Sequence, residues 1–454
     1  MRRNSRYVML VFVVLAFAKA YSQQTPLPIL SREEAKSLML QNNYGIQIAE
    51  NEENIAENNQ SLLNSGYLPI LQGTAGADID ETDSRTEFGS PNDPADERRD
   101  PIVINDAETR TYNAAIALNY TLFDGLGRLY NFKRLKEQYN LSQLQARETI
   151  ENTTVQLMSV YLEVARLTEN LNVLNETLDV SKNRLTRVEY QFDYGQVSKL
   201  EVLNAKVDIN TDSVNVLNAR QQLENTKRDL NVILNRELAV SFAVDTTVTL
   251  MNELRLESLL NQVNENNVRL LQTASNVQIS DYDIKTARAL MLPRVGLTGS
   301  YGWNRQENPQ GPFFPSNTRQ STSLRIGASL TWDIFDGGLS ITGIRNSKIA
   351  YENEILFKKQ VEQEVDRDVA NALGNYRNAV AVFELQEQNV ITNTNNFERT
   401  EEQFKLGQVN SVEFRQAQIN LLNAETSRNL AKYDAKLAEY QLLQFTGQLL
   451  NIVL

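Results

Sequence analysis

The chemistry open to this chain is restricted by the side chains that it lacks. Its 454 residues include no cysteine and no histidine, which excludes disulfides, Cys or His zinc sites, and nucleophiles that rely on a histidine base. Carboxylates remain for metal or acid–base chemistry, and Asp281 and Asp283 form one such pair. Residues two apart do not share a helix face, so this pair has little support. The sequence predicts no enzyme, with no catalytic residue, metal site or cofactor.

Two short segments of similar sequence have the character of an interaction site. Residues 192–197 read Phe-Asp-Tyr-Gly-Gln-Val, and residues 404–409 read Phe-Lys-Leu-Gly-Gln-Val. Their glycines can supply the positive φ that a tight connection between two antiparallel helices needs. Small and apolar residues exposed at such a tip can accept the end of a partner helical hairpin. The predicted docking residues are Gly195, Gln196, Val197, Gly407, Gln408 and Val409.

An acidic residue follows each tip. Ser198 and Asn410 are good N-caps for the returning helices, and Glu201 and Glu413 stand three residues after them. This spacing is that of a capping box. The glutamates therefore have two alternative interpretations, as local caps or as charged groups at an opening. Three copies of Glu413 around an axis would repel one another and select for cations.

Long helices must position these tips. Residues 102–292 and 316–454 contain no proline, and proline breaks helix interiors. The sequence predicts helices over residues 126–193 and 338–406, each roughly 100 Å long at about 1.5 Å per residue. A heptad seam indicates a coiled coil and consists of Leu171, Leu174, Leu178, Ser181, Leu185, Val188 and Phe192. The charged residues between them are interpreted as a solvated face: Glu176, Lys182, Arg184, Arg187 and Glu189.

The chain is an internal repeat. A shift of 212 residues places Phe123-Asp124-Gly125 on Phe335-Asp336-Gly337 and Gly195 on Gly407, and upstream a shift of 224 places Asn42-Asn43 on Asn266-Asn267. Such matches indicate two homologous halves. The first repeat covers residues 21–236, with its tip at 194–198. The second covers residues 266–454, with its tip at 407–410. Residues 237–265 break the helical pattern between them.

Each repeat also contains two stretches that alternate between apolar and other residues, as a half-buried strand does. The predicted strands cover about residues 70–79, 111–122, 294–303 and 322–334. About 10 residues is the length that a tilted strand needs to cross a bilayer. Aromatic residues at both edges are expected of a membrane girdle: Tyr112, Tyr301 and Trp303 at the loop ends, and Tyr120, Phe123, Trp332 and Phe335 at the helix ends. The alternative is a soluble sheet packed on helices.

Charge and the N-terminus limit where such a protein acts. Residues 1–20 combine Arg2, Arg3 and Arg6 with an apolar run and Ala18-Lys19-Ala20, which predicts a cleaved secretion signal. The apolar run is too short for an anchor helix of about 20 residues. The remaining chain has 41 basic and 57 acidic residues, a net charge of −16, so nucleic-acid binding is not expected. Without an apolar spanning helix, the pattern favours a barrel, and four strands need other copies to close it.

The repeat, the Leu-Pro and Phe-Asp-Gly positions, the two tips and the ending Phe445-Thr446-Gly447 together resemble the TolC-type outer-membrane efflux family. The resemblance implies a mixed α and β membrane protein. Three chains would form a trimeric 12-stranded outer-membrane β-barrel, with four strands from each chain, continued by a long periplasmic coiled-coil barrel. Residues 237–265 resemble the family's equatorial insertion. The implied role is the exit duct of a tripartite efflux pump or type I secretion system, with a periplasmic adaptor and an inner-membrane transporter as partners.

The resemblance also implies a periplasmic aperture. Glu413 falls on an acidic position that rings this aperture, and a second acidic position is occupied by Gln416. The family's aromatic is retained as Phe404, whereas its arginine is replaced by Val409, which cannot form an ion pair. Glu201 is the acidic residue after the other tip. The predicted aperture residues are Glu201, Phe404, Glu413 and Gln416.

Two functions of different classes remain open from the residues alone. One is a passive duct, which must place strand residues such as Ile116 and Ile326 in lipid. The other is a secreted coiled-coil scaffold or adaptor without a channel. The loop over residues 81–109 is expected to be extracellular and solvated, with no specific ligand. The transported substrate is not encoded in any recognisable motif.

Overall fold

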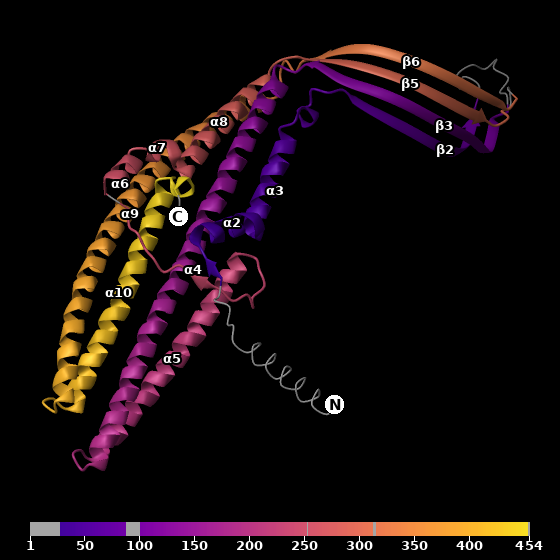
Figure 1. The fold of residues 1–454 in the computed structure, drawn as a ribbon. Coiled ribbons are helices and arrows are strands. Elements are labelled where there is room, and N and C mark those ends of the chain that lie inside the picture. The colour runs from indigo at the N-terminus through magenta and orange to yellow at the C-terminus, as the bar shows by residue number, and fades with distance from the viewer. Residues whose placement is uncertain (1–27, 88–99, 252, 312–314, 453–454) are drawn as a thin grey trace, which may run out of the picture. The chain divides into compact units, whose positions relative to one another are not determined.

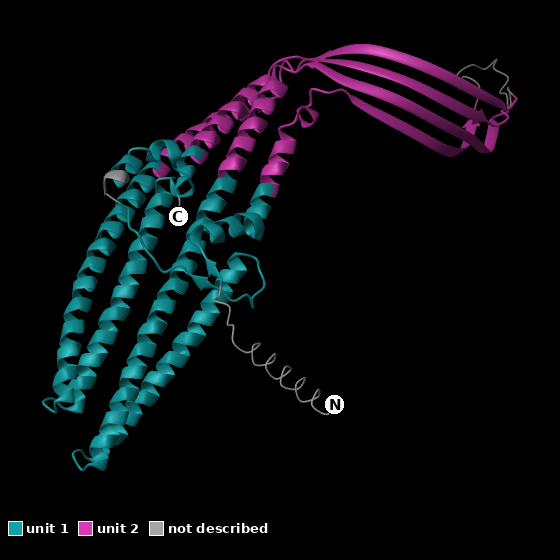
Figure 2. Ribbon diagram, viewed as in Figure 1, with its two compact units in different colours: residues 1–50, 145–271, 362–454 teal, residues 51–144, 272–361 magenta. Residues whose placement is uncertain are grey.

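The computed structural model describes residues 28–87, 100–251, 253–311 and 315–452. The predicted signal over residues 1–20 and residues 88–99 of the acidic loop lie outside this range. The chain divides into two compact units (Figure 2). The first unit comprises residues 1–50, 145–271 and 362–454, and the second comprises residues 51–144 and 272–361.

Helices account for most of the described chain, and each repeat contains one of 67 residues. The longer helices are α2 (Arg32–Asn42), α3 (Tyr44–Asn59), α4 (Gly127–Asp193), α5 (Lys199–Ile233), α8 (Val268–Ala289), α9 (Leu339–Lys405) and α10 (Ser411–Phe445). The short ones are η1 (Leu62–Asn64), α6 (Glu253–Leu260), α7 (Val263–Asn266) and η2 (Leu449–Asn451). Across the described segments, we find no helix with a stretch both long and apolar enough to cross a bilayer.

The Phe-Asp-Gly motif starts each 67-residue helix. The Asp124 carboxylate accepts the Arg128 N–H at 2.9 Å, and the Asp336 carboxylate accepts the Ser340 N–H at 2.7 Å. These bonds satisfy backbone donors that have no partner inside the helix. The two residues after each aspartate have positive φ, at 69° and 70° in the first half and 71° and 92° in the second. In both repeats the motif is therefore a turn whose first residue, the aspartate, caps the helix that follows the turn.

The four long strands form one antiparallel sheet in the order β2-β3-β5-β6. The strands are β2 (Ile70–Thr86), β3 (Ile102–Phe123), β5 (Arg294–Asn308) and β6 (Asn317–Thr331). They contain 15 to 22 residues, more than the predicted length of about 10. Backbone pairing continues past the apolar alternation toward the loops because a ladder needs no apolar side chains. At the other end, β6 ends at Thr331 rather than at residue 334.

Figure 1 shows the four strands side by side in one sheet. Their register places apolar residues from all four strands on one face of this sheet. One cross-strand row joins Gly73, Ile116, Tyr301 and Leu324, and another joins Leu71, Leu118, Gly299 and Ile326. The rows that alternate with the apolar rows along the strands belong to the other face, and their residues are mostly polar or small, such as Asn113, Thr298 and Ser323. The large apolar side chains are exposed, with Leu324 at 71% and Ile326 at 79%. One face is therefore apolar and uncovered, and the other is polar.

The repeat is reproduced in the hydrogen bonding of two equivalent asparagines. The Asn43 side chain accepts the Gly45 N–H at 2.9 Å and donates to the Ile233 carbonyl at 3.0 Å. The Asn267 side chain accepts the Leu270 N–H at 3.2 Å and donates to the Phe445 carbonyl at 2.7 Å. Each asparagine thus begins one helix and joins it to the end of the return helix of its repeat.

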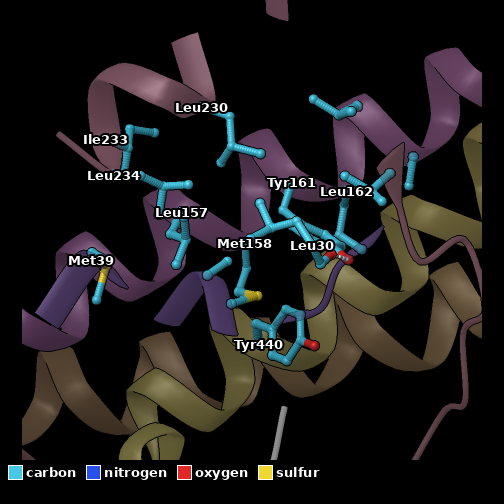
Figure 3. Close-up of a cluster of buried hydrophobic side chains, with 14 of the residues drawn as sticks. Leu30, Met39, Leu157, Met158, Tyr161, Leu162, Leu230, Ile233, Leu234 and Tyr440 are labelled. Carbon is cyan, nitrogen blue, oxygen red and sulfur yellow. Dashed lines mark hydrogen bonds between the residues drawn. The ribbon is translucent and has the colours of Figure 1, made fainter. Parts of the chain in front are cut away.

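The segment between the repeats is packed into the main core. A parallel pair joins β1 (Ile29–Leu30) to β4 (Ala243–Val244). Figure 3 shows the buried cluster to which Leu30 belongs. The Tyr161 hydroxyl donates to the Leu30 carbonyl at 2.7 Å and accepts the Asp245 N–H at 3.0 Å. The fully buried members include Met39, Leu157, Met158, Leu230, Leu234 and Tyr440.

Candidate functional site

The two helix tips have the same backbone geometry. In the first tip, Gly195 N–H donates to the Phe192 carbonyl and Gln196 N–H to the Gln191 carbonyl, both at 2.8 Å. Gly407 and Gln408 make the equivalent bonds at 3.1 and 2.8 Å. This is the Schellman motif, in which a left-handed residue ends the helix. Gly195 and Gly407 have φ of 72° and 75°, so the positive φ predicted at both tips is confirmed.

An apolar cluster packs the two tips of one chain against each other. Val188 and Val202 come from the first helical hairpin, and Phe404 and Phe414 from the second, and all four are buried. The Phe404 and Phe414 ring centroids lie 4.8 Å apart. Val197 and Val409 are half-buried against this cluster. Phe404 is thus held in the interior of the tip region, with 8% of its surface exposed.

A groove of about 450 Å³ lies between the tips and gathers part of the predicted site. Its lining includes the predicted residues Gln196, Val197, Glu201, Phe404, Gly407 and Val409. Glu413 and Gln416 do not line this groove. Both are exposed, and Gln416 lines a separate hollow beside Arg415. Of the four predicted aperture residues, Glu201 and Phe404 therefore line the groove, and Glu413 and Gln416 lie outside it.

The glutamates do not form the predicted capping boxes among the residues that the structure describes. Asn410 alone caps α10, because its side-chain oxygen accepts the Val412 and Glu413 N–H groups, both at 2.9 Å. The Ser198 side chain makes no cap bond. Over the same described residues, the Glu413 carboxylate has no ion pair, and Glu201 Oε2 is buried without a hydrogen-bond donor. The local-cap interpretation is wrong for both carboxylates.

A buried polar cluster lies next to the tips and was not predicted. Arg415 of α10 donates to both Asp212 oxygens, at 2.7 and 2.9 Å, and Ser181 donates to Asp212 at 2.6 Å. Arg184 pairs with Asp208, and its side chain is only 2% exposed. The prediction that Arg184 belongs to a solvated face is therefore wrong. Arg184 lies between Ser181 and Val188, two positions of the heptad seam that are also buried. Its place beside these two positions could have predicted its burial from the sequence.

Exposed apolar side chains surround the predicted docking residues. Tyr194 is 81% exposed, Val412 72%, Leu406 71% and Leu200 61%. Surface apolar residues are unremarkable when scattered, but a group of them marks an interaction surface. The sequence prediction had missed these four, although each lies within five residues of a tip glycine.

The predicted girdle residues lie on or next to the apolar face of the sheet. Tyr112, Tyr301, Trp332 and Phe335 are exposed, between 36% and 86%, and Trp303 and Tyr120 are half-buried. An irregularity between Thr121 and Phe123 brings Phe123 onto the same face as Tyr120, opposite Val295. Beyond Tyr112 this face becomes charged, with Glu108–Arg110 and Arg305–Glu307 ion pairs at 2.5 and 2.6 Å.

Three girdle residues that were predicted at loop ends lie inside their strands. Tyr112 is in the middle of β3, which begins at Ile102, and Tyr301 and Trp303 precede the end of β5 at Asn308. Tyr301 lies opposite Ile116 and Leu324, inside the apolar area. Trp332 follows the end of β6 and donates its indole N–H to the Met291 carbonyl at 3.1 Å. From Tyr112 to Phe123, about ten steps of about 3.3 Å tilted by about 40° span roughly 25 Å, the height of a membrane band.

Comparison with known proteins gives consistent matches. The outer membrane efflux protein family matches residues 36–236 and 259–448. The chain is 22% identical to the outer membrane protein TolC of Vibrio cholerae over 303 residues, 66% of this chain and 69% of that protein. It is 20% identical to the alkaline protease secretion protein AprF of Pseudomonas aeruginosa, over 99% of this chain and 89% of that protein. The CmeC outer membrane channel of Campylobacter jejuni has the same fold, with a TM-score of 0.72 at 17% identity over 92% of this chain and 86% of that chain.

Proposed function

Because the chain belongs to the outer membrane efflux protein family, it is an outer-membrane exit duct with a periplasmic helical extension, and we propose that three copies share one twelve-stranded barrel. The duct is passive, and its energy comes from a partner pump. We infer no catalytic role for any of its residues. The alternative of a secreted scaffold without a channel loses its support with the family assignment.

The observation that carries the trimer is the four-stranded sheet with two open edges and an exposed apolar face. In lipid, each unpaired backbone group costs several kcal/mol, so β2 and β6 need partner strands. Two copies would give eight strands, enough for a narrow or plugged barrel, and three give twelve, enough for a lumen. The aromatic residues at the edges of the apolar face then lie at the two membrane interfaces.

The helix tips are the proposed docking site for a periplasmic adaptor. The groove beside Val197 and Val409 and the exposed Tyr194, Leu406 and Val412 offer apolar surface at the ends of two helical hairpins. Such a surface suits the end of a partner coiled coil. The adaptor would connect the duct to an inner-membrane transporter. The family is named for efflux, and AprF is named as a protease secretion protein, so efflux and protein secretion are both candidate roles of this duct.

The proposed periplasmic aperture contains an acidic ring. Glu413 is exposed and its carboxylate is not used as a local cap, which favours a role toward the axis of a trimer. Gln416 leaves the second position uncharged. Glu201 and Phe404 belong to the groove between the tips and would act by fixing the tips in place.

The proposal is tested by extracting the protein from isolated outer membranes with mild detergent and measuring its native mass. The expected result is a trimer that gives stable conductance steps when it is inserted into a planar bilayer. A monomer in detergent that forms no conducting species would contradict the shared barrel, although not the family assignment.

A further inference from the structure

The two edge strands of the sheet carry opposite charges on the same face. β2 has Asp78 and Asp80 on the polar face, and β6 has Arg319 and Arg325 there. The pairing register places them together, because Asp78, Thr111, Gln306 and Arg319 form one cross-strand row. Within β6 there is no acidic residue at all. The polar face therefore has an acidic edge and a basic edge.

These four charges have no partner within the described part of the chain. All four residues are exposed, and none takes part in an ion pair among residues 28–87, 100–251, 253–311 and 315–452. Two charged pairs of the inner strands, which lie on the opposite face, behave differently, since Arg110 pairs with Glu108 and Arg305 with Glu307. The charges of these two pairs are thus neutralised within the chain, whereas the four charges on the polar face of the edge strands are not. An edge with unpaired charge of one sign fits an edge of the other sign.

A second copy of this chain is the occupant that fits both edges, and this inference rests on the proposed trimer. In a closed barrel of twelve strands tilted by about 35–45°, a row that leaves β6 of one copy does not meet the same row on β2 of the next copy. It meets β2 about four to six residues further along the strand. An unshifted row would put Asp78 opposite Arg319. A shift of about six residues in one direction puts Asp78 opposite Arg325. Pairings of Asp80 with Arg319 or Arg325 need shifts outside this range.

We propose that β2 of one copy pairs with β6 of the next, with Asp78 opposite Arg325 on the lumen side of the barrel. Asp80 and Arg319 strengthen the attraction between the same two edges. Opposite charges directly across a strand pair stabilise it, and like charges destabilise it. The pair also fixes the register, because a slip by one residue would move Arg325 to the lipid face. The ion pairs thus select the correct closure of three identical sheets.

Cysteine cross-linking tests the register directly, because the chain has no cysteine of its own. Directly opposite residues of an antiparallel pair have Cα atoms about 4.5–5.5 Å apart, within the range of a disulfide. The Asp78→Cys/Arg325→Cys variant should form dimers and trimers on denaturing gels under oxidation, and reductant should return them to monomers. Asp78→Cys/Arg319→Cys, in which the two positions share a row within one chain, is the matched control. Cross-linking of the control but not of the 78/325 pair would overturn the proposed register.

Charge reversal tests the role of the ion pair. Asp78→Arg or Arg325→Asp alone should lose most of the trimer in mild detergent, and Asp78→Arg/Arg325→Asp together should restore it. Swapping the in-chain pair with Arg305→Glu/Glu307→Arg should leave the trimer intact. If the wild-type protein is a trimer and neither single charge reversal weakens it, the proposed ion pair is contradicted but the shared barrel is not. A monomeric wild-type protein would instead contradict the proposed function itself.

Discussion

Arg415 Nη2 lies 2.7 Å from Asp212 Oδ1, and this contact joins the two helical hairpins of the chain. Arg415 belongs to the return helix of the second repeat and Asp212 to that of the first. Both side chains are shielded, with 15% and 3% of their surfaces exposed. Gln418 adds to the joint by donating to the Thr177 carbonyl at 2.9 Å. The hairpins are therefore held together by buried polar contacts beside the apolar tip cluster.

Replacing Arg415 should destabilise this joint more than an exposed ion pair would. Arg415→Met leaves the Asp212 carboxylate buried without its cation, and we expect a loss of about 3 kcal/mol in the free energy of unfolding. Lys206→Met is the control, because Lys206 and Glu189 are about half exposed and such pairs contribute less than about 1 kcal/mol. Urea unfolding in detergent, followed by helical circular dichroism, measures both. Equal losses in the free energy of unfolding would mean that the Arg415–Asp212 pair stabilises the chain no more than an exposed ion pair does.

Gly447 should tolerate no side chain. A Cβ built at this position would lie 2.1 Å from the Asn266 carbonyl oxygen, and its φ is +69°. Gly407 has a φ of +75° but nothing within 4 Å. Gly407→Ala should therefore lose about 1 kcal/mol from backbone strain alone, whereas Gly447→Ala should lose at least about 3 kcal/mol because the contact adds to the strain. The same urea titration compares the two variants, and similar losses would contradict the steric argument.

The repeat architecture was predictable because both halves use the same residues for the same bonds. Asn43 and Asn267 each cap a helix and hold the end of a return helix, and the Phe-Asp-Gly turns start both 67-residue helices. These are short motifs that recur at a fixed spacing, so they can be recognised from the sequence alone. The faces of the strands were also visible, because alternation fixes which residues share a side.

Long-range polar contacts were not predictable in the same way. Arg184 looks like a surface residue in a heptad pattern, and the Asp208 carboxylate that pairs with it lies on another helix, which the pattern does not identify. The loop ends of the strands were missed because the ladder continues where the alternation stops. Trp303 therefore lies five residues before the end of β5. Such features depend on partners that a periodic pattern does not identify.

Glu151 should give the stability a dependence on pH. Burial raises the pKa of this carboxyl above its usual 4.5, and the Arg147 guanidinium opposes the shift. An acid with a raised folded-state pKa contributes stability that is present below the unfolded pKa and is lost as pH rises through the folded pKa. The melting temperature should therefore fall less for Glu151→Gln than for the wild type between pH 4.5 and pH 7. Parallel curves would show that Glu151 does not titrate in this window.

Gly407→Trp should block adaptor docking without affecting assembly. The glycine lies in the groove between the tips, with open space around it, so a large side chain fits within the chain but fills the surface offered to a partner. We expect loss of efflux in cells and an unchanged native mass in detergent. Glu352→Trp is the control, since this residue is exposed on α9 far along the sequence from either tip. Normal efflux by Gly407→Trp would place the docking surface elsewhere.

Glu413→Lys should change the ion preference of the open duct. The exposed Glu413 carboxylate has no partner among the described residues, and Asn410 alone caps the helix, so the substitution leaves the local structure intact. Three glutamates near the axis favour cations, and three lysines favour anions. The reversal potential in a planar bilayer under a salt gradient should therefore shift toward the value for anions. Glu402→Lys reverses an exposed charge that pairs with Lys405 within the chain and serves as the control. If both variants keep the wild-type reversal potential, Glu413 does not face the conduction path and the acidic ring is not there.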